Sequence, residues 1–254
     1  MTSIEEVFED GNAFMPFTVA GYPTKEKSGK IIETLIDSGA DIIELGIPFS
    51  DPMADGPTIM EADQEALDNG FKTEDAFDIA SEFTETPIVL MAYVNTLRAY
   101  GYEKFIRDAE DAEVEGLIVP DLPPEEYRKE MEDIDTELDS IFLVAQNTPE
   151  ERMEEINEMT EGFAYLVSVK GTTGARNDFA EKAEKLIQRT SKMDVPRAIG
   201  FGVSSREHAE AAVDAGADGV IVGSALIDAY REGGLEGLEK LAEQLKAGIE
   251  GGKE

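Results

Sequence analysis

The chain has 254 residues, of which 41% are hydrophobic, so it is long enough to bury a full core. Its charge is strongly unbalanced, because 22 Lys and Arg stand against 56 Asp and Glu and give a formal net charge of −34 at pH 7. Such a charge repels nucleic acids and anionic membranes, so we expect neither as a partner.

The composition also argues against several kinds of site. With no cysteine, the chain has no disulfide, no thiolate nucleophile and no cysteine-bound zinc. With a single histidine, His208, neither a histidine metal cluster nor a Ser-His-Asp triad is expected, and we predict no metal site. We expect His208 on the surface, in the first turn of a helix that Ser204 and Glu207 cap.

The first residues are acidic and lack the basic flank and apolar core of a signal peptide, and no apolar run approaches the roughly 20 residues that span a bilayer. We therefore expect a soluble, cytoplasmic protein. Its acidic surface repels itself in dilute buffer, whereas at about 1 M salt the Debye length falls to about 3 Å. This favours a halophilic protein from a salt-rich cytoplasm. The alternative is an acidic mesophilic protein that is not adapted to high salt.

Short apolar runs rich in β-branched residues recur along the whole chain and predict strands. The acidic segments between nearly all of them have apolar residues at a spacing near 3.6, which predicts helices. The expected strands are Ala13–Val19, Asp41–Leu45, Pro87–Tyr93, Gly116–Val119, Ser140–Val144, Phe163–Val167, Arg197–Gly200 and Gly219–Val222. The expected helices are Lys25–Ser38, Thr73–Phe83, Tyr102–Glu110, Pro124–Asp133, Pro149–Thr160, Asp178–Ser191 and Ser205–Asp214.

Strands that alternate with helices predict an α/β fold with a parallel sheet, and eight such units in this length favour a single-domain (β/α)8 TIM barrel over residues 1–254. An open doubly wound sheet is the alternative, because periodicity does not show whether a sheet closes. The joints SGADIIELG and AGADGVIVGS each end a helix and begin a strand. Gly39 and Gly216 suit the left-handed position after those helices.

The stretch from Asp41 to Thr58 carries the strongest candidates for catalysis. Glu44 lies inside an apolar run, and an acid that points from there into a closed barrel has a raised pKa and can exchange protons near neutral pH. Asp55 follows in the loop after the strand, at the end where parallel barrels hold their ligands. A structural hydrogen-bond network around Glu44 is the alternative, and we interpret Asp51 as a turn residue.

Two glycine motifs follow the last two expected strands, GFGVS at Gly200–Ser204 and GSAL at Gly223–Leu226. The backbone N–H groups of such turns bind anions together with the N-termini of the helices that follow. Barrels commonly hold a phosphate after strands seven and eight, so we predict a phosphate site here. Tight turns without a ligand are the alternative.

The segment GTTG at Gly171–Gly174 follows the sixth expected strand and is interpreted as a lid or as a plain surface loop. Gly174 also offers an N–H group to the phosphate. Lys170 precedes this segment, and in an aldolase a lysine at such a place forms a Schiff base with a carbonyl substrate. No neighbouring feature of the sequence lowers the pKa of Lys170, so we interpret it as solvated.

Aromatic and aliphatic residues at strand ends form a candidate slot for a flat ring. A ring at one end, a phosphate at the other and two acids between them favour an aryl sugar phosphate as the substrate. The residues of this slot are Phe17, Tyr93, Ile118, Tyr165, Phe201 and Ile221.

Six motifs resemble the α subunit of tryptophan synthase, over nearly the whole chain. The most specific is ELGIPFSDPMADGPT at Glu44–Thr58. Thr172 departs from the valine that is usual in this family, and Lys170 from a small or polar residue, which leaves the kinetics of loop closure open. The other motifs are PFTVAGYP at Pro16–Pro23, VPDLP at Val119–Pro123, GTTGAR at Gly171–Arg176, GFGVSS at Gly200–Ser205 and GSAL at Gly223–Leu226.

The resemblance implies a lyase of tryptophan biosynthesis that splits indole-3-glycerol phosphate into indole and glyceraldehyde 3-phosphate by a retro-aldol step. By this resemblance Glu44 is the acid/base for the carbon and hydroxyl protons, and Asp55 is the partner of the indole N–H. Thr173 would help to close the loop over Asp55. Phe17, Tyr93, Ile118 and Tyr165 would flank the indole and glycerol portions, while Gly174, Phe201, Gly202, Gly223 and Ser224 would surround the phosphate.

The resemblance also implies a β subunit as the partner, in an α2β2 complex. That subunit carries pyridoxal phosphate and receives indole through a tunnel, whereas this chain needs no cofactor of its own. The residues alone leave two other interpretations open: a Schiff-base aldolase that acts through Lys170, and a non-catalytic phosphate-binding subunit that activates a partner. The presence of Glu44 and Asp55 argues against the second interpretation. Acids at an apolar site lower stability, and a chain without catalytic activity has no reason to keep them.

Overall fold

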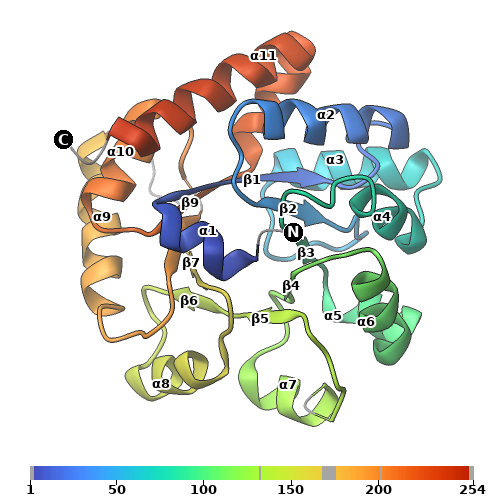
Figure 1. Cartoon of the computed structure of the whole chain (residues 1–254), viewed down its shortest axis with the longest axis horizontal. Helices are drawn as coiled ribbons and strands as arrows, with labels where there is room; N and C mark the ends of the chain where they lie inside the picture. Colours follow the sequence, from blue (N-terminus) through green and yellow to red (C-terminus); the bar gives the residue numbers. More distant parts are fainter. Residues whose placement is uncertain (1–2, 132, 168–175, 201, 252–254) are drawn as a thin grey trace.

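The computed structural model of the chain describes residues 3–131, 133–167, 176–200 and 202–251, with the backbone alone for residues 176–178. Within these residues nine parallel strands form one sheet in the order β5-β4-β3-β2-β1-β9-β8-β7-β6 (Figure 1). The strands are β1 Ala13–Val19, β2 Ile43–Gly46, β3 Ile88–Met91, β4 Gly116–Ile118, β5 Asp139–Ile141, β6 Leu143–Ala145, β7 Ala164–Val167, β8 Arg197–Gly200 and β9 Gly219–Val222.

The sheet returns to itself, as the prediction of a barrel requires. Its two terminal strands, β5 and β6, are consecutive in the chain and are separated by Phe142 alone. The expected strand Ser140–Val144 was therefore wrong in one respect, because it is two short strands. The ladder changes partner at Phe142, since β5 pairs with β4 and β6 pairs with β7. This closure excludes the open doubly wound sheet.

The expected helices all occur, with ends that differ by a few residues, and helices that the sequence did not indicate accompany them. Among the latter, α3 begins with Pro57 directly after the loop that carries Asp55, and α11 contains Gly234, whose backbone is not helical. The helices are α1 Ile4–Asp10, α2 Lys25–Asp37, α3 Pro57–Asp68, α4 Thr73–Ala80, α5 Val94–Tyr100, α6 Tyr102–Asp111, α7 Pro124–Glu130, α8 Glu150–Met159, α9 Arg176–Arg189, α10 Arg206–Asp214 and α11 Ser224–Gly251.

Two local predictions have different outcomes. Gly39 and Gly216 follow the caps of α2 and α10 with φ of 92° and 96°, so both take the left-handed conformation that was expected. The predicted cap of α10 was wrong by one residue, because the side chain of Ser205, and not that of Ser204, accepts a hydrogen bond from the backbone N–H of His208.

The strands have two buried faces, as in a barrel wrapped by helices. Ile43 and Leu45 point outward into the apolar layer between the sheet and the helices, whereas Ile42 belongs to a second cluster inside the barrel. Because side chains alternate along a strand, Glu44 points to the same inner side as Ile42. The predicted direction of Glu44 is therefore confirmed.

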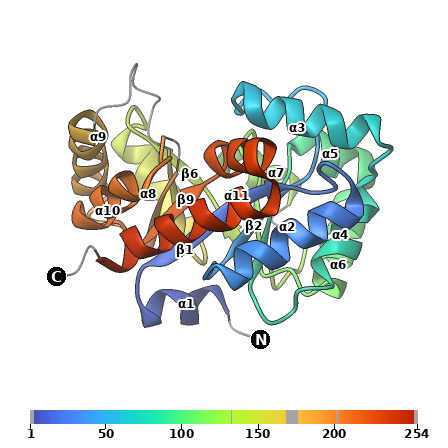
Figure 2. The same cartoon turned by 90° about the horizontal axis from the view of Figure 1, so that it is seen from above.

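Helix α1 lies across the amino-terminal end of the barrel (Figures 1 and 2). Its Ile4 has no exposed surface and belongs to the inner cluster. Its Phe8 contacts Phe163, with ring centroids 5.9 Å apart. The helix therefore closes the end of the barrel opposite to the carboxyl ends of the strands.

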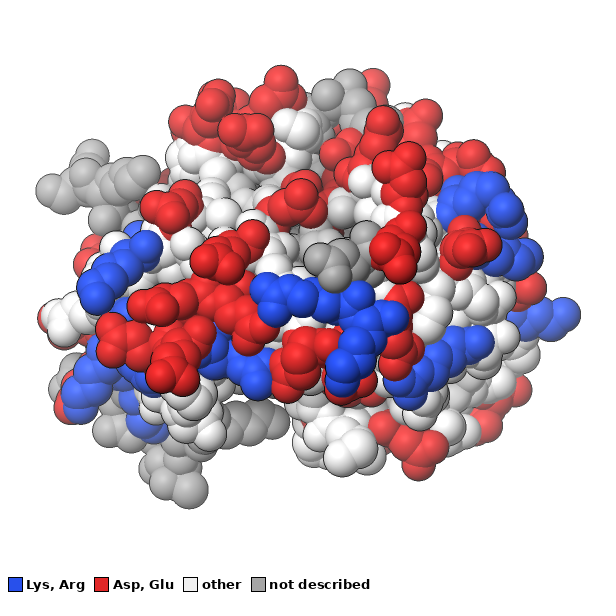
Figure 3. Space-filling model, turned by 90° about the horizontal axis from the view of Figure 1, so that it is seen from below, with Lys and Arg blue, Asp and Glu red and all other residues white. Residues whose placement is uncertain are grey.

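Acidic side chains cover much of the face on the side of α7 and α8, and Lys and Arg side chains lie among them in a band (Figure 3). Ion pairs join these two helices directly, from Arg128 to Glu155 and from Arg152 to Glu125. In the part of the chain that the structure describes, no helix combines the length and the apolar character needed to cross a membrane.

Candidate active site

A cavity of about 280 Å³ opens at the carboxyl ends of the strands. Strand ends, the loop between β2 and α3, the loop after β8 and the start of α11 all contribute to its wall. The lining residues are Phe17, Glu44, Ala54, Asp55, Gly56, Ile59, Met91, Ile118, Pro120, Leu143, Tyr165, Gly202, Val203, Ser204, Ile221, Gly223, Ser224, Ala225 and Asp228.

Glu44 is the most deeply buried acid of this cavity, with 1% of its surface exposed. Its Oε2 atom has no hydrogen-bond partner among the described residues. Burial raises the pKa of Glu44 to about 8, and the nearby charge of Asp55 adds to this effect. One oxygen of Glu44 therefore lacks, among these residues, the partner that a structural network would give it, and the raised pKa favours the protonated form at neutral pH.

Asp55 lies in the loop after β2 and is held by a residue from the end of β3. The hydroxyl of Tyr93 donates to Asp55 Oδ2 over 2.6 Å and accepts a hydrogen bond from the backbone N–H of Ala54 over 3.0 Å. Burial raises the pKa of Asp55, and the hydrogen bond from Tyr93 opposes this by favouring the ionised form. Tyr93 therefore fixes the place of this carboxyl group and favours its ionised form.

Two glycines at strand ends make room for the aromatic rings of the cavity. A Cβ atom on Gly46, at the end of β2, would lie 2.6 Å from the ring of Phe17. A Cβ atom on Gly200, at the end of β8, would lie 2.7 Å from the ring of Tyr165. Since such distances are far below van der Waals contact, both rings can occupy their positions only because these residues have no side chain.

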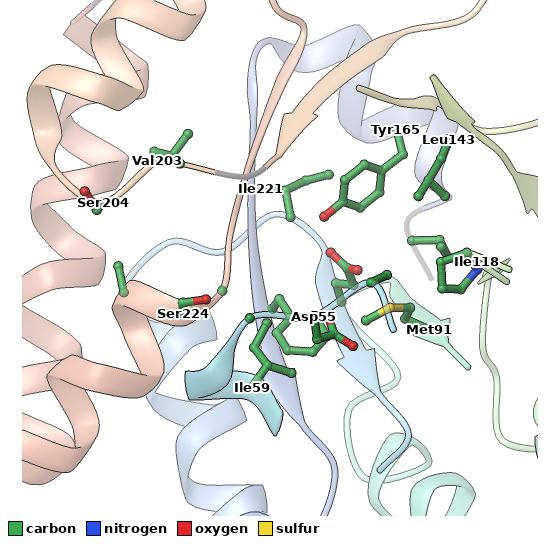
Figure 4. A pocket seen from close by; sticks show the side chains of 18 of the residues that line it. Asp55, Ile59, Met91, Ile118, Leu143, Tyr165, Val203, Ser204, Ile221 and Ser224 are labelled. Atoms are coloured by element: carbon green, nitrogen blue, oxygen red, sulfur yellow. The ribbon is translucent and has the colours of Figure 1, made fainter. Parts of the chain in front are cut away.

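The two ends of the cavity differ in chemistry. Figure 4 shows Met91, Ile118 and Leu143 on one side and Ser204 and Ser224 on the other, with Asp55 between them. The serine side also includes two glycines and the first turn of α11, so it presents backbone N–H groups and hydroxyls. None of the lining residues in the described part of the chain is Lys or Arg. The cavity thus offers an apolar seat on one side of Asp55 and, on the other, a polar seat that has no cation among these residues and also includes the carboxyl group of Asp228.

The structure brings most of the predicted site residues to this one cavity. Tyr93 does not line it and instead lies behind Asp55. Thr173, Gly174 and Phe201 lie outside the described residues, as does Lys170, so their predicted roles are not placed. The predicted residues that line the cavity are Phe17, Glu44, Asp55, Ile118, Tyr165, Gly202, Ile221, Gly223 and Ser224.

Sequence reasoning missed Met91, Leu143 and Asp228 as lining residues. Met91 ends β3 and therefore carried the same strand-end signal as Ile118, which ends β4, whereas Leu143 begins β6 and lay inside the single strand expected over Ser140–Val144. Asp228, on α11, was missed because that helix was not predicted. The described residues contain no group of His, Cys, Asp or Glu that could hold a metal ion.

Comparison with known proteins decides the family. The sequence model of the family described as "Tryptophan synthase alpha chain" matches residues 5–252. The chain belongs to the tryptophan synthase alpha chain family. Among its relatives, the alpha chain of Methanothermobacter thermautotrophicus is 45% identical, with 96% of each chain covered. That of Haloferax volcanii is 40% identical, with 98% of this chain and 96% of the relative covered.

Solved structures of the family have the same fold. An alpha chain of the tryptophan synthase α2β2 complex of Pyrococcus furiosus is 43% identical, with a TM-score of 0.86 over 93% of this chain and 99% of that chain. Tryptophan synthase of Mycobacterium tuberculosis in space group F222 gives 38% identity and a TM-score of 0.88 over 98% of this chain and 99% of that chain. The predicted TIM barrel is therefore confirmed both by the closed sheet and by these relatives.

Proposed function

We propose that Glu44 and Asp55 carry out the reaction of this family, the cleavage of indole-3-glycerol phosphate into indole and glyceraldehyde 3-phosphate. The observation that carries this assignment is the buried carboxyl of Glu44, which lacks a partner on Oε2 and shares one cavity with Asp55. An unpaired acid in an apolar site lowers stability, and proton transfer gives it a use.

The chemistry needs a group that first gives and then takes a proton. Protonated Glu44 gives its proton to the indole carbon that bears the glycerol chain, and the ionised carboxyl of Asp55 stabilises the positive charge that develops at the indole N–H. Glu44 then removes the proton of the glycerol hydroxyl next to the ring. The C–C bond breaks, its electron pair returns to the ring, and the aldehyde forms. Glu44 ends the cycle protonated, as it began.

The two seats of the cavity fit the two ends of this substrate. The indole ring occupies the apolar side, beside Phe17, Ile118, Tyr165 and Ile221. The phosphate occupies the side of Gly202, Gly223 and Ser224, whose N–H and hydroxyl groups bind anions. We also assign the phosphate to Gly174 and Phe201, and closure over Asp55 to Thr173, on the resemblance of the motifs alone.

The partner of this chain is a β subunit, to which the indole passes for tryptophan synthesis. Pyridoxal phosphate resides in the β subunit of this family, and we propose that the present chain works without a cofactor of its own. We further propose that residues 1–254 form one domain, that the protein is cytoplasmic, and that its net charge of −34 is an adaptation to molar salt.

Indole release from indole-3-glycerol phosphate tests the assignment, with the purified chain in molar KCl and with or without a β subunit. We expect release by the wild type and by Glu65→Gln, which removes an exposed acid of α3. We expect Glu44→Gln to lose about a thousandfold in kcat while it still binds glycerol 3-phosphate, because one acid/base group contributes about 10² to 10⁴ in rate. Release at the wild-type rate by Glu44→Gln would refute the role of Glu44.

A further inference from the structure

A further buried acid lies close to the site but does not line the cavity. Asp63, on α3, has 4% of its surface exposed. The neighbouring buried residues of this helix are Ile59, Ala62 and Ala66, all apolar. An acid on the buried face of an amphipathic helix lowers stability unless its oxygens are used.

The contacts of Asp63 lead to Asp55 in three steps. Its carboxyl group accepts a hydrogen bond from the backbone N–H of Phe49, in the loop between β2 and α3. The ring of Phe49 stacks on that of Tyr93, with centroids 5.1 Å apart and planes 23° apart. The hydroxyl of Tyr93 donates to Asp55. The start of the loop, the ring behind it and the carboxyl group at its end are therefore held together.

The titratable groups that face Asp63 are Asp55 and Tyr93, which belong to the loop after β2 and to the end of β3. Burial raises the pKa of Asp63 to about 8, and the charge of Asp55 adds to this effect. At neutral pH the group is therefore uncharged, and it can accept the Phe49 N–H without a cation beside it.

We propose that Asp63 is a positioning residue for the cleavage reaction, which fixes the loop at Phe49 and thereby aligns Tyr93 and Asp55. This inference rests on the proposed function, because the alignment of Asp55 matters only if Asp55 acts on the substrate. What the site requires of Asp63 is an uncharged hydrogen-bond acceptor of this size, so an amide in its place preserves the alignment.

Three variants test the proposal by indole release in molar KCl with a β subunit. Asp63→Ala removes the acceptor, and we expect kcat to fall at least about tenfold, since small misplacements at an active site can cost about a hundredfold. Asp63→Asn keeps the acceptor and is expected to restore kcat to within about threefold of wild type. Asp68→Asn is the matched control, because Asp68 is an exposed acid at the end of the same helix.

A double variant separates positioning from general loss of structure. If Asp63 acts through the hydrogen bond of Tyr93, Asp63→Ala has little further effect on kcat in a Tyr93→Phe background, because groups that act as a unit are not additive. The affinity for glycerol 3-phosphate, which binds at the other end of the cavity, stays within about twofold in Asp63→Ala and in the double variant. The proposal would be overturned if the double variant lost in kcat the full product of the two single losses, or if kcat were unchanged in Asp63→Ala.

A second measurement does not depend on activity or on the alanine variant. The amide resonance of Phe49 is expected to shift with pH near the pKa of Asp63, about 8, and this shift disappears in Asp63→Asn. A Phe49 amide that does not respond to Asp63 overturns the inference. If the wild type with its β subunit releases no indole while the Phe49 amide responds as expected, the proposed function fails and the hydrogen bond stands.

Discussion

Tyr93 and Asp55 are 38 residues apart in the chain, and a hydrogen bond of 2.6 Å joins the hydroxyl of one to the carboxyl of the other. Tyr93 follows β3, and Asp55 lies in the loop after β2, so the bond crosses between neighbouring units of the barrel. A loop residue is thereby given the fixed orientation of a strand end, which the stabilisation of a charge in the transition state requires.

The first prediction concerns this bond. In Tyr93→Phe the carboxyl of Asp55 loses the donor that favours its ionised form, so the already raised pKa of Asp55 rises further. The acid limb of the profile of kcat against pH is expected to move to higher pH, with a loss of about tenfold at neutral pH. Steady-state rates of indole release from pH 5 to 9 measure both effects. An acid limb at the same pH in both proteins would show that Asp55 does not titrate in the reaction.

The second prediction concerns stability. The pKa of Glu44 rises from 4.5 to about 8 on folding, so the folded state holds the proton more tightly than the unfolded chain. The associated stabilisation is complete below about pH 4.5 and is lost as the pH rises through about 8. Glu44→Gln has no proton to lose, so its stability relative to wild type is expected to rise by about 3 kcal/mol between pH 4.5 and pH 7.

Denaturant unfolding at several pH values, in molar KCl, measures this difference. The burial of an unpaired amide lowers the stability of the variant at every pH, so the change of the difference with pH is the quantity to compare. Asp63 also has a raised pKa, but it is present in both proteins and its contribution cancels. A difference between the two free energies of unfolding that stays constant from pH 4.5 to 8 is incompatible with the raised pKa of Glu44.

The third prediction tests the space that glycine leaves for the ring of Phe17. In Gly46→Ala the new Cβ atom meets that ring at 2.6 Å, so we expect a loss of about 1–3 kcal/mol in stability and a higher KM, since overpacking displaces the ring into the cavity. Gly233→Ala is the control, because a Cβ atom there meets nothing within 4 Å. Thermal melts and substrate saturation curves compare the two, and equal values for both variants would contradict the predicted clash.

The fourth prediction concerns salt. The chain has a net charge of −34, and its acidic groups repel one another and the anionic substrate more strongly when the screening length grows. Dialysis from molar to about 50 mM KCl is therefore expected to lower the melting temperature and to slow substrate binding. Glu232→Gln combined with Glu236→Gln removes two exposed acids of α11 and should reduce this dependence. An unchanged melting temperature at low salt would rule out the adaptation.

The same melts also test the number of domains, because one domain is expected to give a single unfolding transition in molar salt.

The sequence was sufficient for the architecture because short apolar runs alternate, along nearly the whole chain, with segments whose apolar residues are spaced near 3.6. It was insufficient at the fifth strand, since the change of pairing at Phe142 depends on which strands lie on either side. Helix α3 was not predicted, because its first residue, Pro57, directly follows a loop rich in Asp, Gly and Pro, and this composition is typical of irregular structure. Only the three-dimensional packing shows that such a segment turns at once into a helix.

Within the site, Glu44 and Asp55 were predictable because an acid inside a buried strand lowers stability, and the loop after such a strand is where barrels bind their ligands. Tyr93 was predicted to flank the substrate, and in the structure its ring faces Phe49 and its hydroxyl faces Asp55. Asp63 gave no signal, because an acid on a helix is normally solvated. Its burial follows from how α3 lies against the barrel, which no local pattern encodes.

The closure of the barrel by α1 has a consequence for exchange with solvent. With Ile4 and the inner apolar cluster beneath the cavity, the described residues seal the amino-terminal end of the barrel and leave the cavity open at the carboxyl ends of the strands. Exchange of substrate, products and water therefore takes place on the side of the loops. A helix at the sealed end thus leaves control of turnover to the loops at the open one.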